Sequence, residues 1–162
     1  MQRRVFLFLL MSALALAVGM AVPGDARAAD TVLTVSGPGG TSAAFDMAAL
    51  DGLPQTAVTT TTPWYDGPRT FSGPLLRTVL QQAGVTGTTL KISALNDYSV
   101  EIPAEDLDLY GVVLASRIDG KPFSVRDKGP LFVIYPFDSR TDLKQEKFYS
   151  RAVWQVAKIA VR

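Results

Sequence analysis

The chain has 162 residues and contains neither cysteine nor histidine. Without cysteine no disulfide can cross-link the fold, so a hydrophobic core alone has to stabilise it. The same absence excludes a thiolate nucleophile, an imidazole base and the side chains that bind soft metals best. Any chemistry therefore depends on carboxylates, amines, guanidinium groups, hydroxyls or a bound cofactor.

The first 28 residues have the pattern of an export signal. Arg3 and Arg4 precede an apolar run over residues 5–22, which ends in a Pro-Gly pair. Residues 26–28 read Ala-Arg-Ala, a small-x-small cleavage site, so we predict a signal peptide over residues 1–28. The run is also long enough for the alternative, an uncleaved membrane anchor.

The export signal sets the expected location and charge. The paired arginines resemble a twin-arginine signal, but the leucine-rich run favours the general secretion route. Either route predicts a bacterial protein that is periplasmic or secreted. Removing residues 1–28 leaves 13 basic and 14 acidic residues, a balance that does not favour a nucleic-acid partner. The remaining residues, 29–162, are about the length of one domain.

Short strand-like runs and turn signals dominate these residues. β-Branched content, alternation and apolar runs of strand length predict six strands, with further strand candidates around Trp154. The six lie over residues 31–35, 55–61, 89–94, 98–102, 112–118 and 131–135. The pair Asp119-Gly120 predicts a tight hairpin turn, since both residues tolerate positive φ.

Helix signals are fewer. Asp46 is a candidate N-cap for a short helix over residues 47–50. A longer helix is expected with Ser72 as its N-cap, Pro74 in its first turn and Gly84 at its C-terminal end. With one or two helices among many strands, the sequence predicts an α+β fold with a mixed, mainly antiparallel sheet.

Polar residues at the ends of these strands are the candidate site residues. Asn96, Asp97 and Tyr98 lie between two predicted strands, where they form either a turn or one wall of a binding pocket. Arg126 and Lys128 lie in a charged loop that is either a solvated turn or, together with Arg151, an anion pocket. Trp64 and Tyr65 are either a lid of aromatic side chains or ordinary core.

The order of these segments resembles a known family. The segments are a Thr-rich strand followed by Phe71-Ser72-Gly73-Pro74, then Leu95-Asn96-Asp97-Tyr98, Ser116-Arg117-Ile118-Asp119-Gly120-Lys121-Pro122, Asp127-Lys128-Gly129-Pro130, and a closing segment with Trp154. Over residues 31–162 the chain resembles the oxidoreductase molybdopterin-binding domain, the sulfite-oxidase fold, in its small exported form.

The resemblance implies a molybdopterin cofactor and shows where this chain departs from the catalytic members. Those members bind molybdenum through a cysteine on the segment before the helix, and here Thr61 stands near that position. A neutral hydroxyl is a poor substitute for a thiolate on a soft metal. Catalytic members also tend to carry an arginine after the Gly-Pro pair, where this chain has Leu131 and Phe132.

Two hypotheses follow from the sequence. In the first, the chain is a non-catalytic exported domain, which binds an anionic small molecule or a periplasmic or membrane redox or signalling protein. It would do so through Thr61, the segment 96–98 and the cations Arg126, Lys128 and Arg151. In the second, it is a periplasmic molybdopterin-dependent oxidoreductase in which the pterin dithiolene and an oxygen ligand hold the metal. The missing cysteine favours the first hypothesis.

Overall fold

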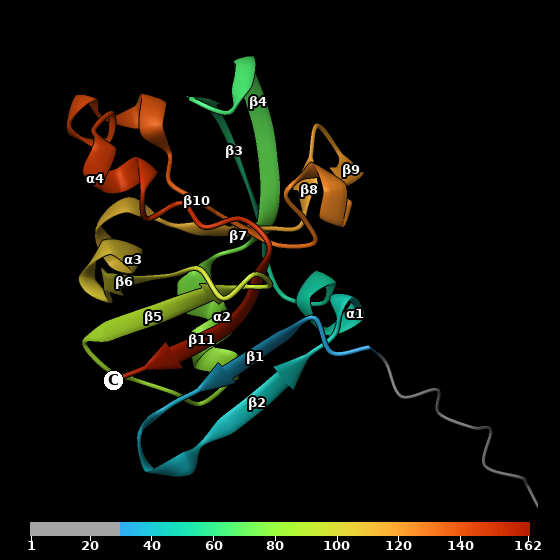
Figure 1. Ribbon diagram of the computed structural model, residues 1–162, viewed down its shortest axis with the longest axis vertical. Coiled ribbons are helices and arrows are strands. Elements are labelled where there is room, and N and C mark those ends of the chain that lie inside the picture. Colours follow the sequence, from blue (N-terminus) through green and yellow to red (C-terminus); the bar gives the residue numbers. More distant parts are fainter. Residues whose placement is uncertain (1–29) are drawn as a thin grey trace, which may run out of the picture.

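The computed structural model describes residues 30–162, and the predicted signal peptide over residues 1–28 lies outside them. Three sheets form its framework (Figure 1). The largest has the strand order β2-β1-β11-β5-β6, in which β1 and β11 are parallel and the other neighbours antiparallel. Its strands are β1 (Leu33–Ser36), β2 (Ser42–Phe45), β5 (Thr89–Ala94), β6 (Ser99–Pro103) and β11 (Val156–Val161).

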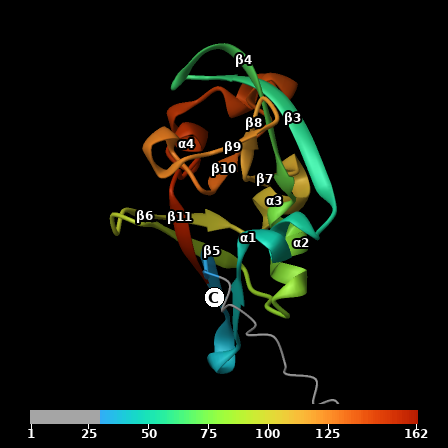
Figure 2. The ribbon, with the colours of Figure 1, turned by 90° about the vertical axis from the view of Figure 1, so that its right-hand side faces the viewer.

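The other two sheets are wholly antiparallel. The second has the order β3-β4-β8-β9, and the third pairs β7 with β10. The long β3–β4 hairpin arches over the end of the molecule opposite the β1–β2 hairpin (Figure 2). These strands are β3 (Gln55–Thr62), β4 (Tyr65–Pro74), β7 (Val113–Ala115), β8 (Arg117–Ile118), β9 (Lys121–Pro122) and β10 (Phe132–Ile134).

Four short α-helices connect the strands within residues 30–162, and none is long and apolar enough to cross a membrane. They are α1 (Met47–Asp51), α2 (Leu76–Gln82), α3 (Glu105–Tyr110) and α4 (Glu146–Tyr149). The predicted α+β class with a mixed, mainly antiparallel sheet is confirmed.

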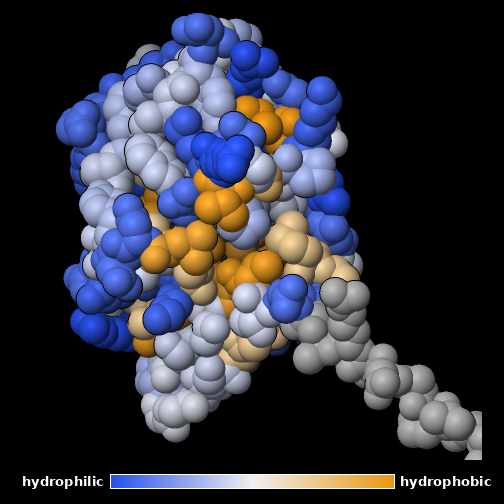
Figure 3. Space-filling model, turned by 45° about the vertical axis from the view of Figure 1, so that its right-hand side comes forward, coloured by the Kyte–Doolittle hydropathy of each residue, from blue (hydrophilic) through white to orange (hydrophobic). Residues whose placement is uncertain are grey.

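The core follows from the period-two pattern of the strands and the apolar side of α2. In β5, Leu90, Ile92 and Ala94 are buried, because alternate side chains of a strand point to the same face. Leu76 and Val79 of α2 are buried in the same core, and Figures 1 and 2 place this helix against the large sheet. Apolar residues also reach the surface on one face, bordered by hydrophilic ones (Figure 3).

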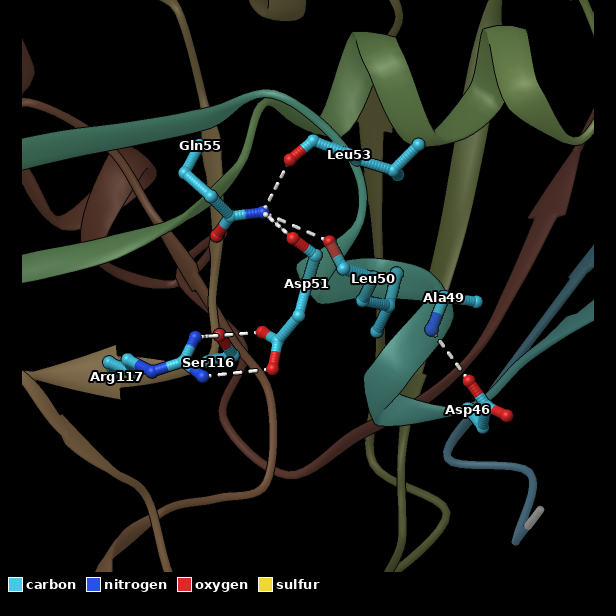
Figure 4. Close-up of polar contacts among 8 residues, drawn as sticks. All are labelled: Asp46, Ala49, Leu50, Asp51, Leu53, Gln55, Ser116 and Arg117. Atoms are coloured by element: carbon cyan, nitrogen blue, oxygen red, sulfur yellow. Dashed lines mark hydrogen bonds and ion pairs between the residues drawn. The ribbon is translucent and has the colours of Figure 1, made fainter.

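Local signals located several elements correctly. The Asp46 side chain accepts a hydrogen bond from the backbone N–H of Ala49, at 2.6 Å, and so caps α1 (Figure 4). Asp119 and Gly120 have φ of +49° and +78° and join β8 to β9, as the sequence predicted. Gly84, with φ of +67°, follows α2.

The predicted start of the long helix was wrong. Ser72 and Pro74 belong to β4, where Ser72 pairs with Arg117 of β8, and α2 begins only at Leu76. Pairing with strands on both sides uses the backbone groups of Ser72 that a helix N-cap would need. The segment before Trp154 was also expected as a strand, but Phe148 lies in α4.

An ion pair joins the first helix to the second sheet. Arg117 donates two hydrogen bonds to the carboxylate of Asp51, at 2.7 and 2.8 Å (Figure 4). The pair lowers the pKa of Asp51 and raises that of Arg117, since each charge stabilises the other. Arg117 therefore fixes the position of α1.

Candidate functional site

A cleft of about 450 Å³ lies between the tip of the β3–β4 hairpin, the β5–β6 turn and the chain from α4 to Trp154. This volume is in the ordinary range for small-molecule sites, roughly 300–1,000 Å³. Its lining is mainly apolar and contains four aromatic side chains, from Trp64, Tyr98, Tyr149 and Trp154. Three polar residues, Asn96, Glu146 and Ser150, also line it.

Two of the other aromatic side chains of the cleft, those of Tyr149 and Trp154, pack on Trp64. Because Thr62 pairs with Tyr65, Trp64 lies in the tight connection between β3 and β4. The centroid of its ring is 6.2 Å from that of Tyr149 and 5.6 Å from that of Trp154, with interplanar angles of 85° and 80°. Edge-to-face packing of this kind is favourable for aromatic rings and fixes their mutual orientation. The cleft therefore has one ring flanked by two rings perpendicular to it.

Phe132 of β10 supports this arrangement from the core. It is fully buried, and its ring lies 5.5 Å from that of Trp64 and 6.1 Å from that of Trp154. Both tryptophans of the chain thus pack on the same core side chain. Phe132 therefore connects both tryptophans of the cleft to the hydrophobic core.

Three segments beside the cleft are joined by hydrogen bonds through Gln155. Its carbonyl accepts from Leu95 N–H at 2.9 Å, its own N–H donates to the carbonyl of Lys128 at 3.0 Å, and its side-chain amide donates to the carbonyl of Val125 at 2.7 Å. The β5–β6 turn, the residues after Trp154 and the loop before β10 therefore lie side by side.

The same three segments contain unusual backbone conformations. Asp97, Lys128 and Gln155 have φ of +64°, +70° and +54°, a region that costs energy for residues with a side chain. Such residues cluster at functional sites more than elsewhere. One lies on each of the three joined segments.

Exposed apolar side chains border the cleft on these segments. Leu95, Tyr98 and Val125 are each more than half exposed, and Trp154 is 37% exposed. We call these four residues the rim. Of the five large hydrophobic side chains that are exposed in the described part of the chain, four belong to the rim, and the fifth, Leu109, is on α3.

Of the residues proposed from the sequence, two line the cleft. Asn96 and Tyr98 do so, and Asp97 lies between them in the turn. The Asn96 side-chain oxygen also accepts a hydrogen bond from the Tyr98 N–H, at 3.2 Å, which is the turn interaction typical of Asn. The segment 96–98 is therefore both a turn and part of the cleft.

Thr61 makes contacts within the protein. Its backbone N–H and its hydroxyl both donate to the carboxylate of Asp138, at 2.6 and 2.7 Å. Lys144 pairs with the same carboxylate at 2.7 Å. The hydrogen bonds from Lys144 and Thr61 lower the pKa of Asp138 to about 2. The Thr61 hydroxyl thus has a donor role that joins β3 to the chain after β10.

The three cations proposed for an anion pocket have separate surroundings. Within the described residues, Arg126 is exposed and forms no hydrogen bond or ion pair. The Lys128 ammonium lies 4.8 Å from the centroid of the Tyr65 ring and 6.0 Å from that of Trp154. Arg151 donates to the carboxylate of Asp106 at 2.6 Å. These contacts give the three side chains no common partner and no place in the lining of the cleft.

Sequence reasoning missed the residues that define the cleft. Glu146 and Tyr149 lie in a helix that the sequence did not reveal, and Trp154 was noted only as a strand residue. For Trp64 the sequence left two alternatives, a lid or the core. The structure shows that it packs on the core and also lines the cleft. The signal that could have found the site was the presence of only two tryptophans, 90 residues apart.

Comparison with known proteins supports the fold alone. No known family profile matches the sequence, and no curated protein matches it. Among solved structures, the chain is similar to the sulfane dehydrogenase SoxCD from Paracoccus pantotrophus, with a TM-score of 0.63 and 19% sequence identity. The match covers 80% of this chain and 37% of that chain. The fold is therefore sulfite-oxidase-like, and at this identity the similarity shows the fold alone.

The residues described here do not fit the molybdenum cofactor that this fold implies. Residues 30–162 contain no group of three or more His, Cys, Asp or Glu side chains arranged to hold a metal, and the sequence offers no thiolate. The hydroxyl of Thr61 donates to Asp138 and so has an internal partner. Lys128 and Arg151, two of the cations proposed for an anion pocket, contact different side chains, Tyr65 and Asp106.

Proposed function

We propose that this chain is a non-catalytic ligand-binding domain on a sulfite-oxidase-like fold, and that a small organic molecule binds in the aromatic cleft. One observation carries the proposal: Trp64, Tyr149 and Trp154 meet at mutually fixed angles around a cleft of about 450 Å³. Mainly apolar clefts with a few polar groups are the usual small-molecule sites. The strained turns beside the cleft support the same assignment.

The location and partners complete the proposal. We place the domain in the periplasm or outside the cell, after export by the general route and removal of residues 1–28. A periplasmic or membrane protein partner stays a prediction of the sequence. The rim, with its four exposed apolar side chains, is the surface on which we place such a partner. The alternative function is a molybdopterin-dependent oxidoreductase. Against it stands that residues 30–162 contain no group of side chains arranged to hold a metal.

The two tryptophans make the proposed site directly observable. Each contributes one indole N–H signal to a ¹H–¹⁵N NMR spectrum, and both side chains line the cleft. Titration with benzyl alcohol, a neutral probe with a flat ring, is expected to shift both indole signals in a saturable manner. Trp154→Leu should weaken the effect on the Trp64 signal, whereas Leu109→Ala, on the exposed side of α3, should leave it unchanged. If the probe shifts other signals and leaves both indoles in place, the cleft is not the binding site.

A further inference from the structure

The charge of the cleft narrows the class of ligand. Among the residues that line it, all within the described part of the chain, Glu146 is the one that carries a charge. Glu146 is exposed, and within residues 30–162 no hydrogen bond or ion pair engages its carboxylate. An anion in the cleft would meet this negative charge without a compensating cation in the lining. The lining therefore favours a neutral or positively charged ligand.

The aromatic rings favour a positively charged ligand over a neutral one. The face of an aromatic ring carries partial negative charge and attracts ammonium groups, and indole does so most strongly. Two indoles and the Tyr149 ring meet at near right angles here, with centroids 5.6 and 6.2 Å apart. A cation is attracted to the faces of such rings and repelled by their edges, so it would bind where the faces of two perpendicular rings converge. This is the arrangement in which several rings can contact one cation.

The chain itself contains an example of the same attraction. The Lys128 ammonium lies 4.8 Å from the centroid of Tyr65 and 6.0 Å from that of Trp154. Within the described residues no carboxylate pairs with Lys128. The closer of the two rings is that of Tyr65, which does not line the cleft, so Lys128 illustrates the attraction and also brings a positive charge near Trp154.

The mainly apolar, aromatic lining of the cleft favours an ammonium ion that carries methyl groups in place of N–H groups, because methyl groups pack on aromatic rings and need no acceptor. The polar side chains of the lining are few: the Asn96 oxygen accepts from the Tyr98 N–H, the Ser150 hydroxyl donates to the carbonyl of Lys147 at 2.9 Å, and the Glu146 carboxylate is exposed. A primary ammonium would need up to three acceptors, and those left without one would cost free energy. A quaternary ammonium needs none.

We infer that the ligand of the cleft is a small quaternary ammonium compound, held by Trp64, Tyr149 and Trp154 and by the carboxylate of Glu146. This inference rests on the proposed function, because it uses the same cleft. It gives the ligand a charge opposite to that expected from Arg126, Lys128 and Arg151.

The test compares choline with 3,3-dimethylbutan-1-ol, which has the same shape and no charge, and with benzoate as an anion. Binding to the purified protein is followed by the two indole signals and by calorimetry. Choline is expected to bind about tenfold more tightly than the neutral alcohol, since a cation–aromatic contact is worth up to about that ratio. Benzoate is expected to bind more weakly than either.

Variants measure separately what the charge of Glu146 and the aromatic rings contribute to the binding of choline. Glu146→Gln should weaken choline about threefold, as for an exposed charge pair, and leave the neutral alcohol unchanged. Glu105→Gln, at an exposed position of α3 outside the cleft, is the matched control and should change neither. Trp154→Leu removes one of the three rings at a partly exposed position and should weaken choline more than the neutral alcohol.

The outcomes distinguish this inference from the proposed function. If the neutral alcohol or benzoate binds as tightly as choline and shifts both indoles, the ammonium inference is overturned and the cleft remains the binding site. If choline binds without shifting either indole, or if no probe binds, both are overturned. Preferential binding of choline that depends on Glu146 supports both.

Discussion

At the scale of single residues, Asp106 shows how a charge is accommodated in the core. It lies in the first turn of α3 and is 5% exposed. Its carboxylate accepts from Arg151 at 2.6 Å and from the Tyr135 hydroxyl at 2.8 Å, and Tyr135 is fully buried. Burial and the neighbouring carboxylate raise the pKa of Tyr135, so the phenol stays protonated and donates. This triad joins α3, the end of β10 and the chain after α4.

We expect Asp106→Asn to lower the free energy of unfolding by about 3 kcal/mol, because it leaves Arg151 without its buried counter-charge. Chemical denaturation at pH 7 measures the loss. Asp108→Asn on the same helix is the matched control, since Asp108 pairs with Arg77 at the surface, and it should lose far less. If both variants lose a similar amount of unfolding free energy, the contact between Asp106 and Arg151 does not stabilise the protein as a buried ion pair.

Arg151 shows that the type of a residue does not reveal its partner in the fold. The sequence left two alternatives for the charged loop, a solvated turn or an anion pocket in which Arg151 joins Arg126 and Lys128. The partner of Arg151, Asp106, is 45 residues away in the sequence. Only the packing of α3 beside the chain after α4 brings the two together.

At the scale of elements, β4 shows how strand pairing can outweigh helix signals. Its last residues, Ser-Gly-Pro at 72–74, read as the start of a helix. Instead Gly73 pairs with Thr56 of β3 and packs closely on the backbone of β7. A Cβ atom at Gly73 would collide with the carbonyl oxygen of Leu114.

Gly73→Ala is therefore expected to destabilise the protein by about 2 kcal/mol, through forced separation of β4 from β7. Ser72→Ala is the control: at a helix N-cap it would cost about 1 kcal/mol, and in a strand it should cost less. Thermal unfolding followed by circular dichroism compares the two. A loss for Ser72→Ala as large as that for Gly73→Ala would contradict the observed end of β4.

The elements predicted correctly are those with local causes. The cap at Asp46, the turn at Asp119-Gly120 and the alternation in β5 each depend on a few neighbouring residues. The strands and helices that sequence reasoning missed, β2, β4, α3 and α4, are short or interrupted by glycine and proline. Their conformations depend on pairing and burial against distant segments, which local propensity does not contain.

At the scale of the whole molecule, the proposed export and the proposed absence of a molybdenum cofactor can be tested together. Protein purified from its native host, from the periplasmic fraction, is expected to begin at Ala29 and to contain far less than one molybdenum per chain. Mass spectrometry and elemental analysis measure the two. An intact N-terminus would favour the membrane anchor, and one molybdenum per chain would overturn the non-catalytic assignment.

By itself the sequence determined which chemistry is excluded and which class of fold is formed. The lack of cysteine and histidine removes thiolate and imidazole chemistry whatever the fold, and the density of strand and turn signals fixed the α+β class. The tertiary structure alone decided which side chains meet. Trp64, Tyr149 and Trp154 come from a hairpin, a short helix and the residues before β11, and they form one cleft because each packs against the aromatic core. Such long-range contacts depend on the burial of the whole chain, so no local pattern could reveal them.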